Sequence, residues 1–258
     1  GMDLYFERHD GEATTIEAFV KSFEDANGVD LSAMLTWYLQ AGTPHLRVSD
    51  DYDAASGTYT LSLSQQTPPT PGQPSKQPQV IPIKFGLIGP NGSPMGWSAV
   101  EGAEVEDEMI VLRGAEATVT FKGIANRPVP SLLRGFSAPV ILEAPLSEDD
   151  RLFLARHDAD PFNRWQAVQD IAMELMVRAA GGAAWSEAQI GGLAAALEET
   201  LGSPTLDDAF KAHALSLPGE TEVARTIGSN VDPDRIHAVR TDLIAALVGR
   251  IEAPLLAA

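Results

Sequence analysis

Histidines and acidic residues are the side chains of this chain that could hold a metal or move a proton, because the sequence contains no cysteine. Its five histidines are His9, His45, His157, His213 and His237. A helix can bind zinc through two histidines one turn apart, in the pattern His-Glu-x-x-His, and no histidine here is followed by glutamate. His9 precedes Asp10, but adjacent side chains rarely face each other. We therefore expect five hydrogen-bonded or surface imidazoles, with no metal ligand and no catalytic base among them.

Two acidic segments could attract a cation. Asp51, Asp53 and Ser56 resemble the start of a calcium loop, which needs glycine at its sixth position and glutamate at its twelfth. Ser56 and Ser62 occupy those positions here, so the segment favours a solvated hairpin turn. The run Glu104–Glu108 precedes a predicted strand, where acidic residues are typical of a solvated loop and of strand-edge protection.

Other motifs of catalytic sites are missing from the sequence. The segment Gly89-Pro-Asn-Gly92 has neither the lysine nor the following helix of a phosphate-binding loop, and no Gly-x-Ser-x-Gly motif occurs. Trp37 and Trp165 lie on apolar helical faces, which indicates core packing. We therefore predict no catalytic, cofactor-binding or metal-binding residue in this chain.

Composition restricts the class of protein further. The chain has 258 residues, 44% of them hydrophobic, with a formal net charge of -18 and a mean hydropathy of -0.05. This is the composition of a globular protein of about two domains or more. The acidic balance argues against nucleic acid and anionic membranes as partners, because both select clustered lysine and arginine. The lack of cysteine fits a reducing compartment, and we expect the cytoplasm.

The first zone of the chain, residues 1–42, has helical periodicity. Thr14 and Glu17 predict a capping box, and an apolar stripe follows it until Asn27-Gly28 ends the helix. Asp30 is expected to cap a second helix that carries Tyr38 on its apolar face. No cap or turn precedes the apolar residues at 4–6, so we expect the chain to begin inside a larger element.

Residues 43–145 change to the two-residue period of strands. Tyr59, Leu61 and Leu63 alternate with hydroxyl side chains, which is typical of a half-buried strand. Further strands are expected at 80–85, 109–113, 117–121 and 138–143. Short strands separated by turn residues indicate an antiparallel β-sandwich. The proline-rich stretch 67–78 is interpreted as a long surface loop within it.

Residues 146–258 return to helical periodicity. Ser147 with Asp150 and Ser186 with Gln189 predict capping boxes, and helices are also expected to start at Asp160-Pro161, Thr205 and Asp232-Pro233. Paired helices with short turns indicate a helical array. The predicted fold class is therefore α+β and multidomain, in three parts: 1–42, 43–145 and 146–258.

Several stretches resemble one known family. They are GMDLYFERHDG (1–11), FVKSFEDANGVDLS (19–32), WYLQAGTP (37–44), VSDDY (48–52), SQQTP (64–68), KQP (76–78), PVPSLL (128–133), FSAP (136–139), FLARHD (153–158) and FNRW (162–165). Together they resemble bacterial aminopeptidase N, the zinc-dependent alanyl aminopeptidases of the gluzincin class. The resemblance is strong to about residue 175 and compositional beyond it.

The resemblance implies an internal fragment of a zinc aminopeptidase that removes N-terminal amino acids from peptides. Residues 1–42 would be the last helices of a thermolysin-like catalytic domain, 43–145 the β-sandwich middle domain, and 146–258 the start of the helical C-terminal domain. The family's zinc motif and its Gly-x-Met-Glu-Asn motif are absent from this chain. The resemblance thus implies zinc in the parent enzyme, none here, and the rest of the same polypeptide as partner.

Two alternatives remain from the residues alone. One is a stand-alone module of sandwich and helices that binds a peptide or protein. The other is a sugar-binding sandwich, which is weaker because no aromatic platform stands out along the strands.

Overall fold

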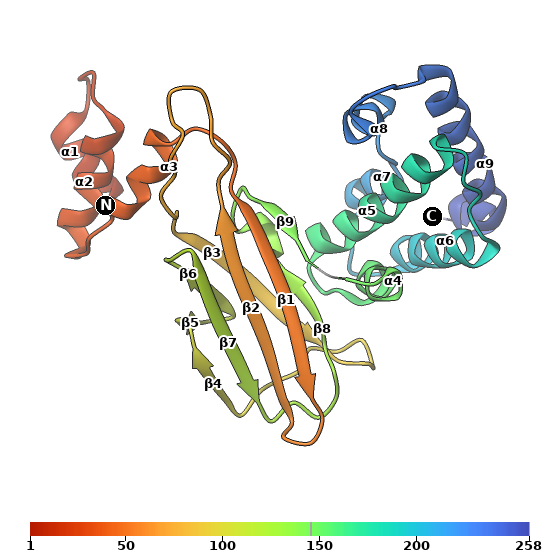
Figure 1. Cartoon of the computed structure of the whole chain (residues 1–258), viewed down its shortest axis with the longest axis horizontal. Coiled ribbons are helices and arrows are strands. Elements are labelled where there is room, and N and C mark those ends of the chain that lie inside the picture. The colour runs from red at the N-terminus through yellow and green to blue at the C-terminus, as the bar shows by residue number, and fades with distance from the viewer. Residues whose placement is uncertain (145, 258) are drawn as a thin grey trace. The chain divides into compact units, whose positions relative to one another are not determined.

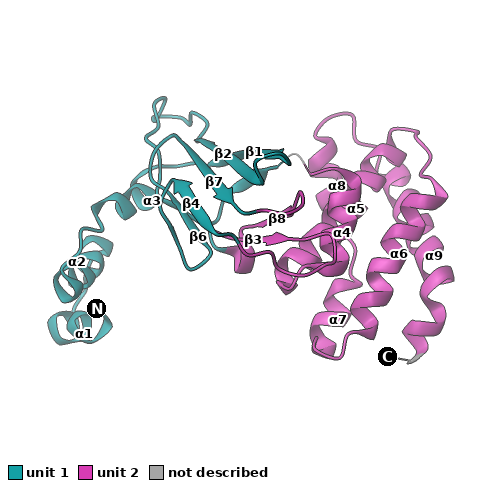
Figure 2. Ribbon diagram, turned by 90° about the horizontal axis from the view of Figure 1, so that it is seen from below, with its two compact units in different colours: residues 1–83, 97–123, 137–145 teal, residues 84–96, 124–136, 146–258 magenta. Residues whose placement is uncertain are grey.

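The computed structural model describes residues 1–144 and 146–257 of the chain. They form two compact units, coloured separately in Figure 2. The first unit comprises residues 1–83, 97–123 and 137–145, and the second comprises 84–96, 124–136 and 146–258. Helices and strands therefore do not divide cleanly between the units, since two strand-bearing segments belong to the helical one.

The first unit begins with short helices. They are α1 (Met2–His9), α2 (Ile16–Asn27), the 3-10 helix η1 (Ser32–Leu35) and α3 (Thr36–Leu39). Helix α2 ends at Gly28 in the left-handed conformation, as predicted. The predicted cap at Thr14 is wrong by one residue, because the Thr15 hydroxyl accepts the Ala18 N–H at 3.3 Å. The second predicted helix is only a 3-10 turn and one α-turn, and Tyr38 is 54% exposed.

A five-stranded sheet follows, with strand order β4-β7-β2-β1-β9 (Figure 1). Its strands are β1 (His45–Asp53), β2 (Thr58–Gln66), β4 (Ala99–Gly102), β7 (Glu116–Lys122) and β9 (Ile141–Glu143). Tyr59, Leu61 and Leu63 of β2 are buried, as their alternation predicted. Strand β1 pairs with β2 along its whole length, from His45↔Gln66 to Asp53↔Thr58. Strand β1 was not predicted, because polar and acidic residues break its alternation after Val48.

The second sheet has the order β5-β6-β3-β8, in which β5 is Val105–Glu106, β6 is Met109–Leu112, β3 is Ile81–Ile88 and β8 is Val129–Leu132. Its β3–β8 and β5–β6 pairs are antiparallel, whereas β9 of the first sheet pairs with β1 in parallel over three residues. The predicted antiparallel β-sandwich is thus confirmed as a two-sheet fold with one parallel edge. Strand β8 was not predicted, because Pro130 removes a backbone donor from a short apolar run.

The second unit contains the helices α4 (Glu148–His157), α5 (Pro161–Ala180), α6 (Glu187–Gly202), α7 (Asp208–Ala214), α8 (Glu220–Ile227) and α9 (Pro233–Ala257). Both predicted capping boxes are present, at Ser147 and at Ser186. Asp160 caps α5 as predicted, by accepting the Asn163 N–H at 3.0 Å. The predicted cap at Thr205 is wrong, because Asp207 caps α7.

Long helices of the second unit share one hydrophobic core. Leu175 and Met176 of α5, Leu193 of α6 and Leu243 of α9 are at most 4% exposed within it. Ile88, the last residue of β3, is buried in the same core. Among the described residues, no helix is both long and apolar enough for a bilayer.

Candidate functional site

The five histidines lie apart from one another in the fold and contact carboxylates or aromatic rings. His45 and His237 place Nδ1 at 2.6 Å from Glu143 and at 2.8 Å from Glu220, respectively. The others contact rings: His9 with Tyr5, His157 with Phe153 and His213 with Trp165. Over residues 1–144 and 146–257, no group of three or more histidine and acidic side chains could hold a metal ion.

Glu143 on β9 joins two basic side chains of β1. One carboxylate oxygen lies 2.6 Å from His45 Nδ1, and the other accepts Arg47 Nε–H at 2.7 Å. The hydrogen bond from Arg47, and then the one from His45, holds the pKa of Glu143 below its usual value. These partners leave the carboxylate ionised and tied across the strand pair, which suits a structural bridge better than a proton shuttle.

The suspected calcium loop is a turn between β1 and β2. Asp53 accepts the Ala55 N–H at 2.9 Å and the Ser56 hydroxyl at 2.6 Å. The Ser56 bond is the main reason that the pKa of Asp53 is lowered. The carboxylate thus serves the turn, in agreement with the hairpin prediction.

The acidic run Glu104–Glu108 contains β5 and the turn at Asp107 and Glu108 that leads from β5 into β6. Asp107 and Glu108 have φ values of 47° and 60°, as a tight hairpin requires. Glu104 accepts Arg113 Nε–H at 3.0 Å. The run therefore belongs to an exposed hairpin, in agreement with the predicted solvated loop.

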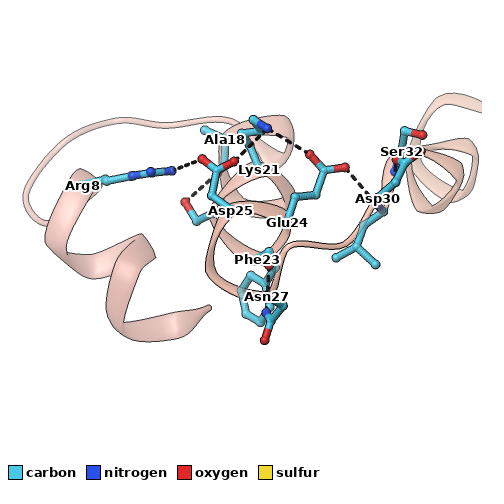
Figure 3. Close-up of polar contacts among 11 residues, drawn as sticks. Arg8, Ala18, Lys21, Phe23, Glu24, Asp25, Asn27, Asp30 and Ser32 are labelled. Atoms are coloured by element: carbon cyan, nitrogen blue, oxygen red, sulfur yellow. Dashed lines mark hydrogen bonds and ion pairs between the residues drawn. The ribbon is translucent and has the colours of Figure 1, made fainter.

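A further group of charged side chains joins α1 to α2 (Figure 3). Arg8 and Lys21 donate to Asp25 at 2.7 and 2.8 Å, and Glu24 accepts the Leu31 N–H at 2.9 Å. The bond from Lys21, followed by that from Arg8, lowers the pKa of Asp25. These are helix-to-helix and helix-to-turn contacts on an exposed surface, where ion pairs contribute little to stability.

Trp37 and Trp165, two of the four tryptophans, are half-buried. Trp37 donates its indole N–H to Val80 O at 3.0 Å, which ties α3 to the extended segment before β3. The Trp165 ring stacks on His213 with centroids 5.3 Å apart. Neither belongs to the buried core, so the predicted core packing is not confirmed.

One group of buried polar side chains in the second unit was not predicted from the sequence. It is the buried polar cluster formed by Ser131, Arg134, Asp158 and Asn163, none of them more than 9% exposed. Arg134 donates to Ser131 Oγ at 2.8 Å and to Asp158 Oδ1 at 3.1 Å. Asn163 donates to Ser131 Oγ at 2.8 Å and to Leu132 O at 2.9 Å. The available signal was that Ser131, Asp158 and Asn163 all lie in stretches that carry the family resemblance.

Electrostatics sets this cluster apart from the surface ion pairs. Burial raises the pKa of the Asp158 carboxyl, against the lowering effect of its hydrogen bonds and of the Arg134 charge. Its Oδ2 is buried without a hydrogen-bond partner. Gly86 lies against the guanidinium, since a β-carbon built there would be 2.1 Å from Arg134 Cζ. The guanidinium and the carboxylate are each other's counter-charge in this cluster, so it has the form of a structural ion pair.

Three of the hollows in the described part of the surface differ in size and lining. One of about 410 Å³ lies over β1, β2 and β7, with Ser49, Ser62 and Thr118 among its lining residues. Another, of about 390 Å³, follows the proline-rich loop, and the third is an apolar groove of about 90 Å³ that includes Leu197 and Leu247. None of them gathers a buried charged or nucleophilic side chain, so none has the chemistry of an active site.

Family models match both halves of this architecture. Residues 42–145 match DUF3458, a domain of unknown function with an Ig-like fold. Residues 148–258 match DUF3458_C, a domain of unknown function described as ARM repeats. The class of the chain is thus an Ig-like β-sandwich followed by a helical region of ARM type.

Curated relatives that carry a similar segment are aminopeptidases N. The chain is 38% identical over its whole length to aminopeptidase N of Escherichia coli and 44% identical over 94% of its length to aminopeptidase N of Caulobacter vibrioides. Among solved structures, Legionella pneumophila aminopeptidase A in complex with aspartic acid matches 98% of the chain, with a TM-score of 0.79 and 26% identity. The chain is homologous to these aminopeptidases N along its length, and it spans only 29% and 27% of the two curated relatives' lengths.

Proposed function

We propose that this chain is a structural, non-catalytic segment of a zinc-dependent aminopeptidase that removes N-terminal amino acids from peptides. The observation that carries the proposal is the match of the whole chain to about a quarter to a third of aminopeptidase N, at 38% identity. Such a match does not favour a stand-alone binding module, because the relatives carry the same segment inside a longer polypeptide.

Within that parent, the proposed parts keep the boundaries predicted from sequence. Residues 1–42 would complete the catalytic domain, 43–145 would form the middle domain, and 146–258 would begin the helical domain. The partners would be the remainder of the same polypeptide and, for the parent, its peptide substrates. The cytoplasm is the proposed compartment, on the expectation drawn from the cysteine-free composition.

The residues of this segment do not fit a zinc site. A catalytic zinc needs three converging protein ligands, and no such group of histidine and acidic side chains exists in the described part of the chain. We therefore derive no catalytic step from it and assign the zinc ligands to the portion of the parent outside this segment.

Elemental analysis and an activity assay test this assignment. We expect the purified chain to contain no stoichiometric zinc and to leave aminoacyl-anilide substrates intact, while a full-length aminopeptidase N assayed beside it loses turnover on chelation. One equivalent of bound zinc in the isolated chain, or turnover by it that scales with its concentration, would contradict the proposal.

A further inference from the structure

Two strands of the sandwich share a compact unit with the helices. The second unit contains residues 84–96 and 124–136, and these hold the end of β3 and all of β8 (Figure 2). The two segments pair with each other in antiparallel register, from Phe85↔Leu132 to Ile88↔Val129. We call them the β3–β8 pair.

Apolar packing joins this pair to the helices. Ile88 is 1% exposed and belongs to the hydrophobic core that contains Ile171, Leu175 and Leu193. Val129, its partner across the strands, packs against the same core. One end of the β3–β8 pair is therefore buried by helices.

Polar contacts join the other end. Ser131 lies on β8, Arg134 directly after it, Asp158 at the end of α4 and Asn163 in the first turn of α5. Asn163 bridges from α5 to β8 through Ser131 Oγ and Leu132 O, and Arg134 bridges to Asp158. Asp158 Oδ1 also accepts the Asp160 N–H at 3.0 Å, which fixes the turn between the two helices.

Backbone strain depends on the same contacts. Leu133 and Phe136 have φ values of 57° and 55°, on either side of Arg134. Left-handed conformations are unfavourable for residues with a β-carbon and persist only where their surroundings enforce them. The side-chain bonds of Arg134 hold this turn, so their loss would release it.

We propose that the buried polar cluster couples the β3–β8 pair to α4 and α5, so that these strands open together with the helices and not with the five-stranded sheet. Separating strand from helix would leave Arg134 or Asp158 buried without its counter-charge, which is strongly unfavourable. Opening both together exposes the pair to water and avoids that state. The cluster thus sets the boundary of a cooperative unit inside the chain.

Native-state hydrogen exchange on the full chain tests the proposal. We expect the amides of Phe85–Ile88, Val129, Ser131 and Leu132 to share their opening free energy and denaturant dependence with α4 and α5. The amides of β1, β2 and β7 should form a separate group. A β8 that exchanges with β1, β2 and β7, or one common opening of all strands and helices, would refute the coupling.

A variant sharpens the test. Asp158→Asn removes the counter-charge, and we expect exchange in β8, α4 and α5 to rise together by on the order of 100-fold, with β1 and β2 unchanged. The matched control is Glu104→Gln, which removes the carboxylate from the exposed ion pair with Arg113. It should leave the exchange rates of all these elements unchanged.

The milder Ser131→Ala covers the case in which Asp158→Asn does not fold. It removes one hydroxyl that accepts from both Arg134 and Asn163, and it should raise exchange in the same three elements by a smaller factor. Acceleration confined to residues 131–136 would show a local contact only and would overturn the proposal.

Discussion

Arg134 shows how a single buried side chain can join several elements of this fold. The Arg134 side chain is 9% exposed and pairs with Asp158, whose side chain is 0% exposed. Its guanidinium also lies against the backbone of Gly86. The nearby surface pair of Arg127 and Asp150 is 43% and 13% exposed, and water can replace either partner there. Only the buried pair leaves an uncompensated charge when one member is lost.

Gly86→Ala tests this close approach. The added methyl group would overlap the guanidinium, so Arg134 must leave its bonds to Ser131 and Asp158 or the strand must shift. We expect a loss of about 1–3 kcal/mol in the free energy of unfolding, measured by urea denaturation followed by far-UV circular dichroism.

Gly96→Ala is the matched control. It lies in the same unit, and a β-carbon built there meets no atom within 4 Å. We expect its unfolding free energy to stay within about 0.5 kcal/mol of the wild type. Equal effects of the two substitutions would show that glycine is not required beside Arg134.

At the scale of elements, the helix starts carry the clearest local information. Ser186 accepts the Gln189 N–H at 3.2 Å while the Gln189 side chain accepts the Ser186 N–H at 2.9 Å. These reciprocal bonds satisfy two backbone donors at the start of α6, whose residues Ile190 and Leu193 lie in the core.

Ser186→Ala should therefore destabilise the helical unit by about 1 kcal/mol. Thermal unfolding monitored at 222 nm measures the change. Ser186→Thr keeps the hydroxyl, and its free energy of unfolding should stay within a few tenths of a kcal/mol of the wild type. A threonine variant as unstable as the alanine variant would argue against the cap as the cause.

Such local rules explain which elements were predictable. The capping boxes and the alternation of β2 depend on neighbours in sequence, so the helices they start and the strand they mark were found. Strands β1 and β8 were missed because their pairing comes from distant partners that override weak local patterns. The buried polar cluster was missed for the same reason, since Ser131 and Asn163 are 32 residues apart.

The prediction that this chain holds no functional site rests on a different kind of observation. Spacing in sequence was enough to reject a zinc helix and an EF-hand, because both need fixed intervals. The structure does place Asp53 at the turn between β1 and β2 and Asp107 and Glu108 in the turn between β5 and β6, as the predicted hairpin and loop require. The family itself was reached through resemblance and not through any catalytic residue in the chain.

For the whole molecule, charge is the dominant global property. A net charge of -18 spread over 258 residues repels itself in the compact state. Exposed ion pairs such as Arg113–Glu104 offset little of this repulsion.

Added salt should therefore raise the melting temperature at neutral pH. Going from about 10 mM to about 150 mM ionic strength shortens the Debye length from about 30 Å to about 8 Å, which screens the repulsion. Scanning calorimetry in sodium chloride measures the shift. Near the isoelectric point of about 4.5 the same salt should have little effect, and a melting temperature that falls with salt at pH 7 would contradict the prediction.

The two edge strands of the five-stranded sheet affect aggregation at high protein concentration. Its outer strands β4 and β9 are four and three residues long, and each carries a glutamate in an ion pair, Glu101 with Lys122 and Glu143 with Arg47. A strand of a second molecule that tried to extend the sheet would find few free backbone groups and would have to displace a charge. Crowded copies of this segment are thus protected against edge-to-edge β-aggregation, so growth of ordered fibrils would first require the sheet to unfold.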